Sequence, residues 1–283
     1  MSLPMPPTIA VVSCGAMGAA VGRRLHDNGA RVITELAGRS AASRARAAAA
    51  GMQDAPAEAL AGADFFLSIL PPGEALALAH RMAGPLTTAS HKAIFVDCNA
   101  ISPATAEAVA AAIAPSGARF VDGSIIGAPP VAGRAGPVFY LSGADAPAAM
   151  GLASFGLETR LLEGAVGAAS GLKMCYGGIT KGVTALASAM ILAADRCGAA
   201  PALRAEMARS LPFMLSWFET QVPGMFPKAY RWVAEMQEVS EFLADDPASA
   251  AIYEAVAALY ARLAEDVAGT GTETAALGAF FKN

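Results

Sequence analysis

The sequence predicts an α/β fold, in which a domain with a parallel sheet over residues 1–163 is followed by an all-helical domain over residues 164–283. Two observations lead to this prediction. Short apolar runs without polar alternation are separated by helical patterns as far as Leu162, which is typical of a parallel sheet covered by helices on both faces. Beyond Glu163 only helical patterns remain, so we expect the second domain to contain helices alone.

The strands of the first domain are predicted from apolar, β-branched runs that end at a glycine, a proline or a polar residue. They are expected at 8–13, 30–36, 52–54, 65–70, 93–97, 119–122, 138–142 and 159–162. A helix is expected after the glycine turn and through Asn28. Further helices are expected over 41–50, 57–60, 73–82 and 147–155, and one is expected to start near Pro103. In the second domain, helix breaks are expected near Gly198, Pro223-Gly224, Asp246-Pro247 and Gly269.

Composition excludes several classes of protein. The 283 residues carry a net charge of −4 with a pI near 5.4 and no long basic tract, which argues against nucleic acid as a partner. No secretory signal and no uncharged apolar run long enough to span a membrane is visible. The four cysteines are widely separated, which argues against a metal site or a disulfide framework. We expect a soluble, cytoplasmic protein.

A glycine turn follows the first strand, with the sequence Ser13-Cys14-Gly15-Ala16-Met17-Gly18. In a strand, turn, helix and strand order, Gly15 lets the backbone approach a pyrophosphate and Gly18 allows close packing of helix on strand. The helix N-terminus then faces the phosphates. We therefore expect a Rossmann-type dinucleotide site, contacted by Ser13, Gly15, Ala16, Met17 and Gly18. Ser13 replaces the usual first glycine, and the alternative is an ordinary tight β–α turn.

The end of the second strand bears on the choice of nucleotide. An acidic residue there binds the ribose 2′-hydroxyl of NAD, whereas a nearby arginine suits the 2′-phosphate of NADP. Glu35 is expected to point to the opposite face from the strand-end position, Leu36. Arg39 and Ser40 follow, and they can contact adenine and phosphate. We favour NADP, with NAD possible. The alternative is that the arginines of this segment form a solvated helix face.

The stretch from Gly164 to Asp195 predicts a mostly buried helix with two lysines, Lys173 and Lys181, and one tyrosine, Tyr176. A buried amine is costly, and a substrate site is one reason for it. A desolvated lysine can protonate an alkoxide or deprotonate a hydroxyl. None of the three histidines is well placed for that role, so Lys173 is the predicted general acid/base. The alternative is that the amine reaches the surface along its stem.

Four short motifs carry a resemblance over nearly the whole chain. They are the glycine turn, the strand end Leu70-Pro71-Pro72, the segment Val96-Asp97-Cys98-Asn99-Ala100-Ile101-Ser102-Pro103, and the helix with Lys173. In this order they resemble the β-hydroxyacid dehydrogenase family, which includes 3-hydroxyisobutyrate and 6-phosphogluconate dehydrogenases. The motif Lys173-Met174-Cys175-Tyr176, followed by Thr180-Lys181-Gly182, resembles the corresponding motif of a less characterised subgroup of phosphogluconate dehydrogenase-like proteins. The resemblance implies a Rossmann-type domain, a helical domain and no metal.

The resemblance also implies site residues. Leu70, Pro71 and Asn99 are expected beside the cofactor, Asn99 near the nicotinamide ribose. The family's substrate loop aligns with residues 122–128, which puts Ser124 and Gly127 near the substrate but Ile126 at the position of the carboxylate-binding serine. Gly177 stands where the family has an asparagine. Tyr176 can donate to the substrate oxygen in its place, or be a core tyrosine. Lys181 can bind an anionic group, or be a surface or interface lysine.

The resulting hypothesis is an NADP-dependent oxidoreductase that interconverts a small or medium hydroxy acid and its carbonyl compound. Its substrate is expected to be a carboxylic acid. Two alternatives remain: an imine reductase and a non-catalytic NADP-binding sensor. A homodimer through the helical domain is also expected, because the aromatic content there exceeds what one small bundle buries: Phe213, Trp217, Phe218, Phe226 and Trp232.

Overall fold

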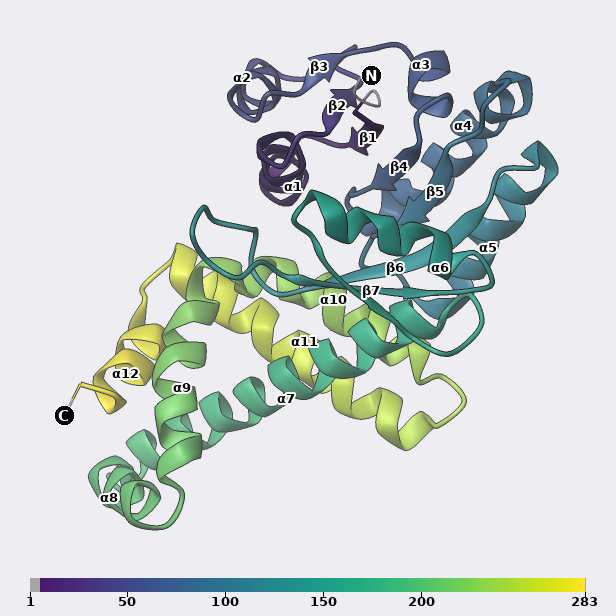
Figure 1. Ribbon diagram of the computed structural model, residues 1–283. Coiled ribbons are helices and arrows are strands. Elements are labelled where there is room, and N and C mark those ends of the chain that lie inside the picture. The colour runs from purple at the N-terminus through teal and green to yellow at the C-terminus, as the bar shows by residue number, and fades with distance from the viewer. Residues whose placement is uncertain (1–5, 283) are drawn as a thin grey trace. The chain divides into compact units, whose positions relative to one another are not determined.

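The computed structural model describes residues 6–282 and divides into two units, Met1–Lys173 and Met174–Asn283. Figure 1 labels most of the helices and strands of both. The division falls inside helix α7, Ala168–Arg196, and not before it at residue 163, where the strand signal of the sequence ends. Each unit has its own apolar core.

Unit 1 alternates strands and helices in the predicted order. Its strands are β1 (Thr8–Val12), β2 (Arg31–Thr34), β3 (Gln53–Asp54), β4 (Phe65–Ser68), β5 (Ile94–Asp97), β6 (Phe120–Ile126), β7 (Val138–Ser142) and β8 (Glu158–Leu161). Its helices are α1 (Ala16–Asp27), α2 (Ala41–Ala49), α3 (Ala57–Ala61), α4 (Ala75–Thr88), α5 (Pro103–Ile113) and α6 (Ala146–Ala149). Every predicted strand is present, within a few residues at its ends.

The strands form one eight-stranded sheet in the order β3-β2-β1-β4-β5-β6-β7-β8. All neighbours are parallel except β6 and β7, which pair antiparallel, so the sheet is predominantly parallel, as the sequence predicts. The connection over 127–137 contains no helix. Parallel neighbours need a crossover of about a dozen residues or more, usually through a helix, so this short loop returns β7 antiparallel.

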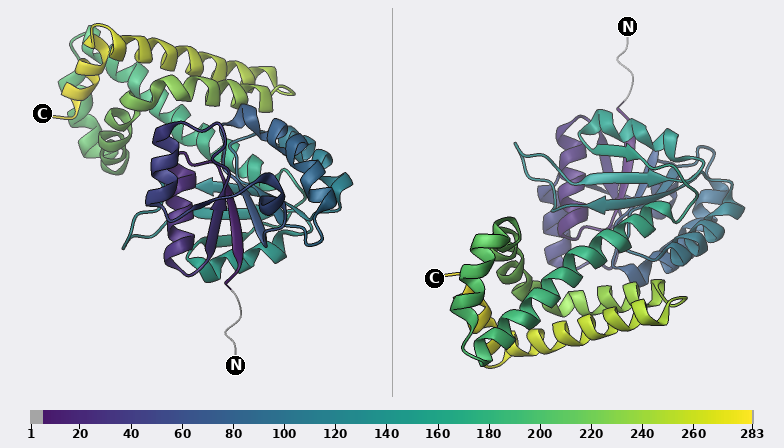
Figure 2. Two further views of the ribbon diagram at one scale, coloured as in Figure 1. Left: turned by 90° about the horizontal axis from the view of Figure 1, so that it is seen from above. Right: turned by 90° about the horizontal axis from the view of Figure 1, so that it is seen from below.

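Two apolar clusters cover the two faces of the sheet, as the absence of polar alternation predicted. One packs Val11, Val96 and Val121 of the strands against Val21 and Leu25 of α1. The other places strand aromatics under the apolar faces of α4 and α5. In that layer the ring of Phe95 lies between those of Phe66 and Phe120, at centroid distances of 4.7 and 6.0 Å. Figure 2 shows helices on both sides of the strands.

Unit 2 is helical. After α7 come α8 (Ala200–Ser210), α9 (Pro212–Met225), α10 (Ala229–Phe242), α11 (Pro247–Ala268) and α12 (Thr272–Phe280). Helices α10 and α11 run side by side (Figure 2). Tyr260 of α11 is fully buried in the core of this unit. The ring of Tyr253 lies against Gly178 and Gly182 of α7, where a Cβ on Gly178 would be 3.0 Å from the tyrosine hydroxyl.

Helix α7 has 29 residues and, of the helices within residues 6–282, it is the one whose length and mean hydropathy would suffice to cross a membrane. The core helices of soluble proteins meet the same two criteria. This property is therefore weak evidence for a membrane span.

Candidate functional site

The glycine turn joins β1 to α1. It is closely packed at Gly18 and has open space at Gly15. A Cβ on Gly18 would lie 1.8 Å from the Ser13 carbonyl oxygen, whereas a Cβ on Gly15 would meet no heavy atom within 4 Å. The Ser13 N–H donates to the Ile69 carbonyl at 3.2 Å and ties the turn to the end of β4. Ala16 and Met17 open α1, whose N-terminal N–H groups have no intrahelical acceptor. This geometry fits a pyrophosphate held over Gly15.

The segment after β2 presents arginines to the same end of the sheet. Glu35 is bound to Arg81 of α4, with a 2.8 Å ion pair, and so points away from the glycine turn as expected from strand alternation. Within residues 6–282, the Arg39 guanidinium has no ion-pair or hydrogen-bond partner. Ser40 caps α2 by accepting the Ser43 N–H at 3.3 Å. The Arg46 Nε donates to the Cys14 carbonyl at 2.9 Å and joins α2 to the turn.

Asn99 ties together the ends of β4 and β5. Its Oδ1 accepts the Leu70 N–H at 2.5 Å, and its Nδ2 donates to Ser68 at 2.7 Å and to Asp97 at 2.9 Å. The Asn99 side chain is buried, while Pro71 is exposed beside it. The structure therefore brings Leu70, Pro71 and Asn99 together at the carboxyl ends of two parallel strands, which is where ligands bind in open α/β sheets.

A row of buried polar residues crosses four strands, and sequence reasoning did not find it. Ser68, Asp97, Asp122 and Ser142 are direct neighbours in register on β4, β5, β6 and β7. All four are buried. The only sign in the sequence is an aspartate at position 97 and another at 122, each directly after a buried valine. That sign does not reveal that the two strands are neighbours in register.

Burial raises the pKa of Asp97 from 3.8 to about 7. Hydrogen bonds from Asn99 oppose this rise, the nearby Asp122 carboxylate adds to it, and the Lys173 ammonium lowers the pKa of Asp97. Burial, above all, also raises the pKa of the neighbouring Cys98 thiol. Lys173 itself is half-buried in the first turns of α7. The predicted acid/base lysine thus interacts electrostatically with the buried row of unit 1.

Ser124 lies inside β6 and not in a loop, because β6 continues to Ile126. Its side chain is 0% exposed, and its Oγ has no hydrogen-bond partner among residues 6–282. An unpaired buried hydroxyl costs about 1–3 kcal/mol. Gly127 follows β6 with φ +129° and opens an exposed loop over 127–137.

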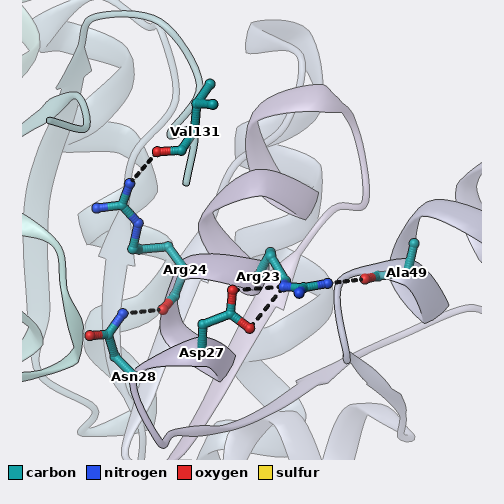
Figure 3. Close-up of polar contacts among 6 residues, drawn as sticks. All are labelled: Arg23, Arg24, Asp27, Asn28, Ala49 and Val131. Atoms are coloured by element: carbon teal, nitrogen blue, oxygen red, sulfur yellow. Dashed lines mark hydrogen bonds and ion pairs between the residues drawn. The ribbon is translucent and has the colours of Figure 1, made fainter. Parts of the chain in front are cut away.

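The side chain of Arg24, in α1, binds main-chain carbonyl groups of that loop (Figure 3). Its guanidinium donates to the carbonyl oxygens of Val131 at 2.9 Å, Arg134 at 3.1 Å and Gly156 at 3.4 Å. Its neighbour Arg23 instead binds Asp27 and the Ala49 carbonyl. The sequence does not distinguish the two arginines, since both occupy the same predicted helix. The glycine-turn helix and the loop after β6 are thereby linked within unit 1.

The predicted residues of unit 2 have separate environments. The Lys181 ammonium forms a 2.8 Å ion pair with Glu235 and lies 5.5 Å from the centre of the Trp232 ring. The Tyr260 hydroxyl donates to the Lys181 carbonyl at 2.6 Å. These contacts give Lys181 a place in the packing of unit 2. Tyr176 is 53% exposed and follows Lys173 by three residues in α7.

Two family descriptions match the chain. Residues 8–154 match the NAD binding domain of 6-phosphogluconate dehydrogenase, and residues 194–263 match a domain of unknown function, DUF1932. No curated protein matches the sequence.

Solved structures resemble the chain over nearly its full length. One is a conserved protein of unknown function, described as structurally similar to 3-hydroxyacid dehydrogenases; it is 28% identical with a TM-score of 0.75, over 93% of this chain and 99% of that one. A conserved hypothetical protein from Sinorhizobium meliloti is 24% identical with a TM-score of 0.77, over 98% and 97%. The Mycobacterium tuberculosis 3-hydroxyisobutyrate dehydrogenase is 22% identical with a TM-score of 0.74, over 93% and 96%. The last two likenesses concern the fold.

Proposed function

The chain belongs to the family of the NAD binding domain of 6-phosphogluconate dehydrogenase, and from that premise we propose that it interconverts a small or medium hydroxy acid and its carbonyl compound. The protein is an NAD(P)-dependent oxidoreductase. The finer proposal assigns NADP as the cofactor and Lys173 as the general acid/base. It rests above all on the place of Lys173, whose ammonium acts on Asp97 at the carboxyl end of β5, the edge of the sheet where ligands bind.

The residues of unit 1 fit a dinucleotide. The open space at Gly15 receives a pyrophosphate, and the N–H groups at the start of α1 hydrogen-bond to it. When bound, the nicotinamide supplies or accepts the hydride. Lys173 gives a proton to the carbonyl oxygen during reduction and removes it from the hydroxyl during oxidation. Ser124 and Gly127 contact the substrate in this proposal, and the unpaired Ser124 hydroxyl is consistent with a missing polar partner. Tyr176 donates a hydrogen bond to the substrate oxygen.

A turnover screen tests the proposal. Purified protein with NADPH is incubated with a panel of short carbonyl acids and, separately, with cyclic imines, and NADPH absorbance is followed. We expect oxidation with at least one carbonyl acid. Oxidation by imines alone would make the protein an imine reductase. Tight NADPH binding without turnover on either panel would favour a non-catalytic sensor.

The preference for NADP makes its own prediction at Arg39. Because its guanidinium is unengaged within residues 6–282, it is available to a 2′-phosphate, and a hydrogen bond between charged groups contributes about 1.5–3 kcal/mol. Arg39→Ala should therefore raise the Kd for NADPH by about 10- to 100-fold and leave NADH binding unchanged, as measured by fluorescence titration. Arg23→Ala, which removes an arginine bound to Asp27, is the control. Wild-type protein that binds NADH as tightly as NADPH would refute the preference.

We also propose that unit 2 forms a homodimer. Ile179, Leu186 and Met190 are exposed along α7, and Phe213 at the start of α9 is 82% exposed. Phe213 lines a shallow apolar cavity of about 230 Å³ with Ile179, Thr180, Val183, Met214 and Trp217. Exposed apolar surface of this kind marks an interface, and a second copy offers the same surface about a two-fold axis. Of the other aromatic residues predicted for the interface, Phe218 is buried in the core of unit 2, and Trp217, Phe226 and Trp232 are partly buried and pack against that core.

Phe213→Glu should dissociate this dimer. A charge at an interface anchor costs about 2–4 kcal/mol, so we expect the dimer dissociation constant to rise at least about 30-fold, with the melting temperature of the monomer unchanged. Light scattering over a concentration series measures it. Val131→Glu, at another exposed apolar residue but in unit 1, is the control. A monomeric wild-type protein would exclude the dimer.

For localisation we propose the cytoplasm. The four cysteines, Cys14, Cys98, Cys175 and Cys197, are all free thiols, which suits a reducing compartment.

A further inference from the structure

Asp122 receives an unusual concentration of hydrogen bonds for a buried side chain. Its Oδ2 accepts the N–H groups of Gly167, Ala169 and Ser170 at 2.9, 3.0 and 3.1 Å, and the Ser142 hydroxyl at 3.0 Å. Its Oδ1 accepts the Ser170 hydroxyl at 2.7 Å. The residue is 0% exposed. With five donors directed at it, the carboxylate acts only as an acceptor.

These bonds replace a missing helix cap. The first N–H groups of any helix lack intrahelical acceptors and are normally satisfied by a side chain just before the helix. Helix α7 begins at Ala168 and is preceded by Gly167, which has no side chain and a φ of +98°. The cap therefore comes from strand β6. It also places a negative charge at the positive end of the helix dipole.

Lys173 lies three residues beyond Ser170, which is about 4.5 Å further along the helix axis. Its ammonium interacts with Asp97, and Asp97 interacts with Asp122. Lys173 of α7 and Asp122 of β6 thus both act on Asp97, at the end of β5, and on Cys98, which follows it directly. Because Lys173 lies in the same helix, the contacts that hold the first turn of α7 also fix the position of the lysine relative to these groups.

We propose that Asp122 is the positioning residue for Lys173: its carboxylate anchors the first turn of α7 and supplies a negative charge to the group of ionisable residues around Asp97, on which the lysine also acts. This inference rests on the proposed function only in calling Lys173 the general acid/base. The anchoring and the charge are properties of unit 1, and they can be measured without turnover.

Two substitutions separate the anchor from the charge. In Asp122→Asn the amide oxygen can still accept the backbone N–H groups, and the amide nitrogen can donate to the Ser170 hydroxyl, so the geometry stays and the charge is lost. In Asp122→Ala both are lost. Asp145→Asn is the matched control, because Asp145 is another carboxylate of unit 1 that accepts a single backbone N–H, from Phe120 at 3.3 Å.

The experiment uses the full-length protein in two measurements. Hydrogen exchange, followed by mass spectrometry, reports on the backbone amides of residues 167–170. Labelling of lysines with acetic anhydride across a pH series reports the midpoint at which each amine loses its proton, since only the neutral amine reacts. Lys92, Lys228 and Lys282 serve as internal references. The labelling is done well above the Asp97 pKa of about 7, so that Asp97 is ionised with or without Asp122.

We expect Asp122→Ala to speed exchange at residues 167–170 at least tenfold, with the exchange of α1 unchanged. We expect Asp122→Asn to preserve exchange protection and to lower the midpoint of Lys173 by about half a pH unit or more, since a nearby negative charge favours the ammonium. Asp145→Asn should change neither. An unchanged Lys173 midpoint in Asp122→Asn, or unchanged exchange in Asp122→Ala, would overturn the inference. If Asp122→Ala does not fold, the Lys173 midpoint in Asp122→Asn alone tests the inference. A failed turnover screen would remove the proposed function without altering these results.

Discussion

Lys173→Met is expected to abolish turnover while NADPH still binds. General acid–base catalysis contributes about 10²–10⁴-fold to a rate, and methionine has a similar length but no proton to give. We therefore expect kcat to fall at least about 10³-fold in single-turnover measurements with a substrate from the carbonyl-acid panel. The Kd for NADPH, measured by fluorescence titration, should stay within about twofold, because the proposed cofactor contacts come from the glycine turn, the segment after β2 and the strand ends at Leu70, Pro71 and Asn99, and none comes from Lys173.

Lys173→Arg is the matched control. Arginine keeps the positive charge that acts on Asp97 but does not release its proton at any accessible pH. If the lysine serves proton transfer, both variants lose turnover. The arginine variant should still keep the stability of the wild type well above pH 7, where the buried Asp97 carboxylate is ionised and is stabilised by a nearby cation. Turnover retained by either variant within tenfold of the wild type would refute the catalytic assignment.

The two glycines of the turn should fail in opposite ways. In Gly18→Ala the new methyl group would lie 1.8 Å from the Ser13 carbonyl oxygen, and a backbone atom cannot move aside cheaply. Overpacking costs about 1–3 kcal/mol or more, so we expect the free energy of unfolding to fall by about 3 kcal/mol and NADPH binding to be lost with the turn. Chemical denaturation measures the first effect and fluorescence titration the second.

Gly15→Ala should keep the fold and lose the cofactor. Its methyl group would meet no heavy atom within 4 Å, and the backbone angles of Gly15, φ −69° and ψ −177°, are allowed for alanine. The methyl group would, however, occupy the space proposed for the pyrophosphate. We expect unchanged stability and a Kd for NADPH raised at least about 100-fold, the equivalent of about 2.7 kcal/mol. NADPH binding equal to that of the wild type would show that the pyrophosphate does not lie over Gly15.

The strands and their succession along the chain could be predicted from the sequence because each buried strand is apolar on both faces and ends at a turn residue. The direction of β7 could not, since an apolar run carries no direction. The available sign was the connection over 127–137, which has no helical pattern. The end of β6 was also misplaced. Gly123 interrupts the apolar run after Asp122, although the pairing with β7 continues to Ile126.

The candidate site divides in the same way. The glycine turn and Lys173 could be found because their chemistry is local, in spacing and in a charge on an apolar helix. The Asp97–Asp122 row and the cap of α7 arise from strands that become neighbours only in the sheet. Lys181 shows the converse: its charge suggested a ligand, but its partner Glu235 lies on α10, and nothing near Lys181 in the sequence indicates that contact.

The bond between Arg24 and the loop over 127–137 has a consequence for how this protein can change over evolutionary time. Arg24 binds the carbonyl oxygens of Val131 and Arg134, which every amino acid possesses, and no side chain of the loop. Mutations can therefore replace the side chains at positions 131 and 134 while both contacts with Arg24 persist. The place of this loop beside α1 is thus inherited with the arginine at position 24, whichever residues stand at 131 and 134.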